Sequence, residues 1–112
     1  LDEPEVCSAY SRAIAATNTW TDRDVEALLR ISEELLDNPD MRNGATSSVA
    51  RALRTMSKTE RAAALFGLAL AATPRDSALR FELANLLHDM KRFDEADAHY
   101  QLLLDHLSPV TP

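Results

Sequence analysis

Four prolines recur at a constant interval and limit the possible folds of this chain more than any other feature. Pro4, Pro39, Pro74 and Pro109 follow one another at intervals of 35 residues. A fixed period of about 20–50 residues is the sequence signature of a repeat architecture. Each interval has room for two helices of about four turns, at about 3.6 residues per turn, and for two tight connections. The spacing therefore predicts three successive helix pairs.

The residues between the prolines also correspond from one interval to the next, so the repeat extends beyond the prolines themselves. A shift of 35 residues relates the first interval to the second at Ile14 and Val49, Ala15 and Ala50, Ala27 and Ala62, and Ile31 and Phe66. A shift of 34 residues relates the second to the third at Val49 and Leu83, Ala50 and Ala84, Leu53 and Leu87, Ala62 and Ala96, Phe66 and Tyr100, and Ala69 and Leu103. The extra residue falls just before Pro109, where a loop can absorb it.

The composition points to helices. Hydrophobic residues make up 46% of the 112 residues, Ala and Leu dominate them, and two glycines occur. Such a composition suits helices and gives strands little of the branched and aromatic content that they favour. We expect one all-α domain over residues 1–112 and, because the sequence begins at Leu1 instead of Met, a fragment of a longer protein. The predicted helix pairs are at about 4–38, 43–73 and 77–108.

Local signals predict where the individual helices begin. Thr21 and Asp24 have the spacing of a capping box, and Ser57 and Glu60 have the same spacing. Asp76 is placed to cap a further helix, because its carboxylate can accept the free amides of the first turn. The predicted helices are near 4–18, 22–37, 45–56, 58–72, 77–90 and 93–107.

The third interval carries Leu83–Ala84 and Leu87, then Phe93–Ala96 and Tyr100, and finally Pro109. In this order the residues resemble a tetratricopeptide repeat, which has a bulky and a small residue on its first helix, a small residue followed by an aromatic one on its second, and a closing proline. The second interval matches at Ala50, Leu53, Ala62, Phe66, Ala69 and Pro74; the first keeps Ala15, Ala27, Ile31 and Pro39 but has Asn18 and Glu34 at positions that are apolar in the others.

The resemblance implies a right-handed α-solenoid of about three antiparallel helix pairs. Small residues at the crossings, among them Ala84 and Ala96, would let paired helices approach closely. Gly67 falls inside a predicted helix, where it costs about 1 kcal/mol relative to Ala, and we interpret it in the same way, as a site of close backbone packing. A generic helical bundle is the alternative, because Ala-rich helix pairs also occur outside solenoids.

The resemblance further implies a concave groove lined by the first helix of each pair. Residues 41–75 contain six basic and one acidic side chain, whereas both flanking regions are acidic. We therefore expect a protein or peptide partner, which the basic centre of the groove suggests is acidic. The predicted partner-binding residues are Arg12, Arg51, Arg54, Phe81, Glu82, Asn85 and His88. The alternative for the two central arginines is that Arg51 and Arg54 pair with Glu82 and Asp89 on the neighbouring helix.

The predicted helix near 93–107 carries an apolar stripe that no following helix covers. We expect Tyr100, Leu103, Leu104 and Leu107 to form a self-association surface, with a homodimer as its simplest product. The alternative is a monomer in which residues 108–112 fold back over the leucines.

No residues form a recognisable catalytic, metal-binding or cofactor-binding group. His99 and His106 lie seven residues apart, about 10 Å along a helix axis, which is too far to share one metal unaided. The net charge of −6 argues against nucleic acid as a partner, and no apolar run reaches the length of about 20 residues that a membrane span needs. We expect a non-enzymatic, cytoplasmic interaction module, an adaptor or scaffold. The alternative is the substrate-recruiting domain of a larger bacterial enzyme such as a glycosyltransferase.

Overall fold

The computed structural model describes residues 3–37 and 45–107, which form six α-helices. The prediction of an all-α chain is confirmed, and each predicted helix end falls within one residue of the observed one. The helices are α1 (Glu3–Thr17), α2 (Asp22–Asp37), α3 (Ala45–Thr55), α4 (Thr59–Ala72), α5 (Ser77–Asp89) and α6 (Phe93–Leu107).

Two of the three predicted helix caps are present. The backbone amide of Thr21 donates to the Asp24 carboxylate at 2.8 Å, and the amide of Asp24 donates to the Thr21 hydroxyl at 3.3 Å. At the start of α5, the Asp76 carboxylate accepts the amide of Leu79 at 3.0 Å. These side chains satisfy amides that the first turn of a helix leaves without partners.

The capping box predicted at Ser57 is wrong, because Ser57 ends α3 instead of starting α4. Its φ of 65° places it in the left-handed region. The amide of Ser57 donates to the carbonyl of Arg54, and the amide of Lys58 donates to that of Leu53. This is the hydrogen-bond arrangement of a Schellman motif, which closes a helix through one left-handed residue. Lys91, with a φ of 64°, ends α5 in the same way.

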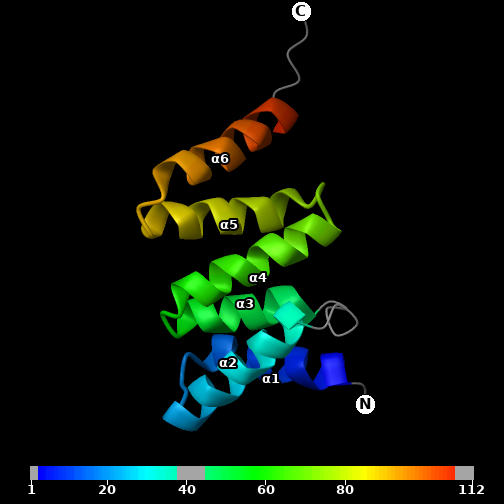
Figure 1. Cartoon of the computed structure of the whole chain (residues 1–112), viewed down its shortest axis with the longest axis vertical. Helices are drawn as coiled ribbons and strands as arrows, with labels where there is room; N and C mark the ends of the chain where they lie inside the picture. The colour runs from blue at the N-terminus through cyan, green and yellow to red at the C-terminus, as the bar shows by residue number, and fades with distance from the viewer. Residues whose placement is uncertain (1–2, 38–44, 108–112) are drawn as a thin grey trace, which may run out of the picture.

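The helices stack into an elongated molecule of 53 × 28 × 25 Å (Figure 1). Helices α3 and α4 pack as one pair, α5 and α6 pack as another, and α4 joins the pairs by packing against α5. The first interval departs from this order. Helix α1 packs mainly against α3, while α2 lies against α3 and α4. The pairwise repeat is thus clearest in the second and third intervals.

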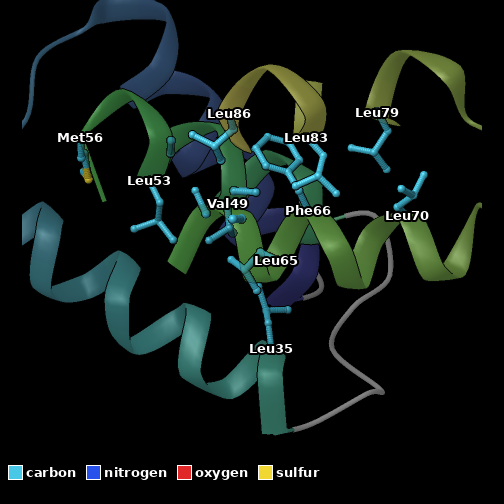
Figure 2. Packing of buried hydrophobic residues seen from close by; sticks show 14 of the residues in the cluster. Leu35, Val49, Leu53, Met56, Leu65, Phe66, Leu70, Leu79, Leu83 and Leu86 are labelled. Atoms are coloured by element: carbon cyan, nitrogen blue, oxygen red, sulfur yellow. The ribbon is translucent and has the colours of Figure 1, made fainter. Parts of the chain in front are cut away.

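The core is centred on α3 and α4. Figure 2 shows side chains from α2, α3, α4 and α5 converging on one cluster, in which Phe66 is the largest fully buried side chain. The small residues predicted at helix crossings are buried, as expected for close helix packing: Ala50, Ala62 and Ala84 are 0% exposed and Ala96 is 1% exposed.

The interpretation of Gly67 as a close-packing site is wrong. Among residues 3–37 and 45–107, a Cβ atom added to Gly67 would meet nothing within 4 Å beyond the surrounding turns of α4. No neighbouring helix therefore requires a glycine at this position.

Candidate functional site

Six of the seven predicted partner-binding residues lie on helices α3 and α5. The spacings within each helix are close to one turn, so its members share one side of that helix. We call the surface formed by Arg51, Arg54, Phe81, Glu82, Asn85 and His88 the α3–α5 face. The seventh residue, Arg12, is exposed on α1, and the contacts of the described residues do not connect it with this face.

An ion pair between Arg51 and Glu82 crosses the α3–α5 face. The Arg51 Nε lies 2.9 Å and 3.1 Å from the two carboxylate oxygens of Glu82. The side chains are 40% and 28% exposed, so water screens the pair in part. For Arg51, the structure therefore agrees with the alternative in which the arginine pairs with the neighbouring helix.

Arg54 has a different neighbour. Its guanidinium lies 5.8 Å from the centroid of the Phe66 ring, a distance at which a cation is attracted to the face of an aromatic ring. The ion pairs found among the described residues do not join Arg54 to Asp89. The expected pairing between these two residues is therefore not present.

Aromatic side chains from α6 support the α5 part of the face. The Tyr100 hydroxyl donates to Oδ1 of Asn85 at 2.5 Å, and its ring packs edge-on against Phe81 at a centroid distance of 6.3 Å. His88 packs in the same manner against Phe93 at 5.0 Å. Phe81 nevertheless remains 52% exposed. Sequence reasoning missed this role of Tyr100, because the register alone did not show that its hydroxyl reaches Asn85.

The predicted self-association stripe on α6 is not exposed along its whole length. Leu103 is 7% exposed because it lies on the same side of α6 as Ala96, which is buried. Tyr100 is half-buried, whereas Leu104 is 54% exposed. The side chain of Leu107 lies outside the described residues. The prediction that Leu103 lies on an exposed surface is therefore corrected, because this residue is buried. Among the predicted self-association residues that the structure describes, Leu104 is the exposed one.

A cleft of about 430 Å³ between α4 and α6 was not foreseen from the sequence. The Arg92 guanidinium bridges one end of the cleft. Its Nη1 lies 3.6 Å from Oε2 of Glu60, and its Nε lies 2.5 Å from Oε2 of Glu95. Its hydrogen bond holds the pKa of the Glu95 carboxyl below the ordinary value and raises that of the guanidinium. The cleft is lined by Glu60, Ala63, Ala64, Leu83, Leu87, Arg92, Glu95, Ala98 and His99.

His99 lies between this cleft and helix α5. One guanidinium nitrogen of Arg80 lies 3.1 Å from its Nδ1, and another donates to the carbonyl of Pro74 at 3.0 Å. Burial, followed by the charge of Arg80, lowers the pKa of His99. The ring is therefore held in its neutral form more firmly than an exposed histidine, which suits Nδ1 as the acceptor of the Arg80 hydrogen bond.

The described residues contain no group of three or more His, Cys, Asp or Glu side chains placed to hold a metal ion. Within the same ranges, no helix is long and apolar enough to cross a membrane.

A family model described as tetratricopeptide repeat matches residues 53–107. Over this stretch, the chain belongs to the tetratricopeptide repeat family. The match begins near the end of α3 and continues through α4, α5 and α6, so it covers the part of the chain where the helices pair most regularly. No curated protein and no solved structure matches the chain. Tetratricopeptide repeats are generally protein-interaction modules and are typically non-catalytic on their own.

Proposed function

We propose that this chain is an adaptor or scaffold domain that binds a segment of another protein on the α3–α5 face. The exposure of Phe81 is the observation that carries the proposal. Phe81 is 52% exposed although its ring contacts Tyr100. A large aromatic side chain at the centre of an interface often supplies much of the binding energy, particularly where polar groups surround it.

The polar groups around Phe81 are held in place by contacts within the domain. Asn85 is fixed by Tyr100, and Glu82 is fixed by Arg51. A partner therefore meets a preorganised surface and does not have to order these side chains when it binds, which lowers the entropic cost of association.

The charge of the region favours an acidic segment. Residues 41–75 hold six basic and one acidic side chain, and two of the basic ones, Arg51 and Arg54, lie on the α3–α5 face. Arg54 stacks on Phe66 and forms no carboxylate pair among the ion pairs of the described residues. A partner carboxylate would bind Arg54 directly, whereas at Arg51 it would have to compete with Glu82. We therefore expect Phe81 and Arg54 to contribute more to binding than Arg51.

Selection of peptides from a display library on the immobilised chain tests the proposal. Selected peptides should bind the wild type, lose about tenfold or more in affinity with Phe81→Ser, and lose affinity with Arg54→Glu. Fluorescence anisotropy at low and high salt measures both effects, and the Arg54→Glu variant should show the weaker salt dependence.

The matched control is Arg30→Glu, which reverses an exposed charge on α2, a helix that contributes no residue to the α3–α5 face. It should leave the affinity unchanged. Peptides that bind Phe81→Ser and Arg54→Glu as tightly as the wild type would refute binding on this face.

A further inference from the structure

The side of the molecule where α4 and α6 flank α5 carries an apolar groove that the α3–α5 face does not use. Helices α4 and α6 run in the same direction on either side of α5 in Figure 1, and both pack against it. The cleft between them has a floor made of Leu83 and Leu87, and walls that include Ala64 and Ala98. Short side chains on both walls leave the groove open.

Gly67 lies on the same side of α4 as Ala64, just beyond the residues that line the cleft. It lies three residues after Ala64 and four before Ala71, both of which are exposed, so the three residues share one side of α4. Glycine inside a helix costs about 1 kcal/mol relative to alanine, and no neighbour among the described residues fills the space beside Gly67. A glycine without an internal packing role allows another backbone to approach α4 closely.

The α6 wall continues past the cleft to Leu102. This side chain is 53% exposed and lines an adjoining cleft of about 260 Å³ together with Arg75 and Arg80. Arg80 and His99 lie between the two clefts and contact each other. The two clefts thus adjoin at the Arg80–His99 contact. We call these two clefts, together with the side of α4 that carries Ala64 and Gly67, the α4–α6 strip.

The two ends of the strip carry opposite charge. At the end where α4 and α6 begin, two carboxylates, Glu60 and Glu95, share the single guanidinium of Arg92, and the side chains of Glu60 and Glu95 are 82% and 52% exposed. At the other end Arg75 lines the cleft with Arg80. A complementary ligand is therefore basic at the first end and acidic at the second.

We propose that the α4–α6 strip binds an amphipathic helix of a partner protein. The apolar side of that helix carries small residues, which pack against Ala64, Gly67 and Ala98. Lys or Arg residues near its first turn face Glu60 and Glu95, and Asp or Glu residues near its last turn face Arg75. In this orientation the positive end of the helix dipole also lies at the acidic end of the strip.

The test uses a displayed library of helical peptides of 14 residues, the length of α4. The library is selected on the wild-type chain after depletion on Gly67→Leu, and the selected peptides are measured by fluorescence anisotropy. We expect peptides with a small-residue side, basic first turns and acidic last turns. Their affinity should fall by about tenfold or more with Gly67→Leu, and less with Glu60→Lys or Arg75→Glu.

Circular dichroism checks that Gly67→Leu folds, and Ala64→Leu, one turn earlier on α4, serves as a second variant that narrows the groove. Phe81→Ala is the control that separates this surface from the α3–α5 face, and it should leave the affinity of these peptides unchanged. The proposal is overturned if no selected peptide distinguishes the wild type from both groove variants, or if Phe81→Ala removes binding as well.

Discussion

The Nε of Arg51 on α3 contacts both carboxylate oxygens of Glu82 on α5, at 3.1 Å and 2.9 Å. Helices from two consecutive repeats are thus joined by one side-chain pair on the proposed binding face. On the proposed function, a partner carboxylate at this point would have to displace Glu82, so we expect the pair to lower the affinity of the face for acidic ligands.

Replacing Glu82 by Gln should therefore strengthen the binding of acidic peptides to the α3–α5 face, because Arg51 is released. Stability should fall by about 0–1 kcal/mol, since the pair is partly exposed. Urea denaturation and fluorescence anisotropy measure the two effects. Asp89→Asn, a carboxylate change on the same helix, is the control. A lower affinity for Glu82→Gln would show instead that Glu82 itself contacts the partner.

Replacing Ala96 by Leu should destabilise the domain by about 1–3 kcal/mol, because the added atoms overfill a tight helix crossing. Ala96 is 1% exposed, whereas Ala98 on the same helix is exposed. Ala98→Leu is therefore the matched control and should change stability by less than about 0.5 kcal/mol. Equal urea midpoints for the two variants would contradict the buried position of Ala96.

The stability of the domain should decrease as the pH falls through the range in which His99 titrates. Its pKa is lowered in the folded state, by burial and by Arg80, so the unfolded chain binds the proton more readily. The contribution of neutral His99 to the stability of the domain is present above the ordinary pKa of 6.5 and is lost as the pH falls through the lower pKa of the folded state. Urea midpoints measured from about pH 8 to about pH 5 should decrease less in His99→Gln than in the wild type. If the urea midpoints of the two proteins changed with pH in parallel, His99 would contribute nothing to the pH dependence of stability.

Self-association through α6 remains a prediction, and the structure changes which residue should be tested. Leu104 is 54% exposed, and burying such a side chain is worth about 1.5–3 kcal/mol. Leu104→Glu should therefore shift any dimer to monomer in sedimentation experiments. Arg23→Glu, an exposed change on α2, should not. A wild-type chain that sediments as a monomer at high concentration would end the hypothesis.

The helices and the tetratricopeptide repeats could be predicted from sequence because their signals are local and repeated. Asp76 caps α5 through an amide three residues away, and Ala62 and Ala96 occupy equivalent buried positions in two repeats. Each of these features depends on a short stretch of chain or on a recurring spacing.

The errors concern relationships that local sequence does not determine. Ser57 has the spacing of a capping residue, but its left-handed conformation serves the end of the preceding helix. The first interval contains Ser11 and Ser32 at fully buried positions, and Arg61 of α4 donates to the Ser32 hydroxyl at 2.9 Å. Such tertiary contacts accompany the different packing of α1. The pairing of Arg51 with Glu82 likewise depends on where the side chains of two different helices lie, which the local sequence does not determine.

The stacked arrangement of the helices also implies an order of opening. Helix α3 packs against α1, α2 and α4, whereas the extensive contacts of α6 among the described helices are with α5. In a molecule held together by neighbouring contacts, each repeat can open while the rest stays folded. Backbone amides of α3 should exchange with deuterium last and those of α6 much earlier. A pulling force applied at the C-terminal end would then peel away α6 first, before the centre of the domain yields.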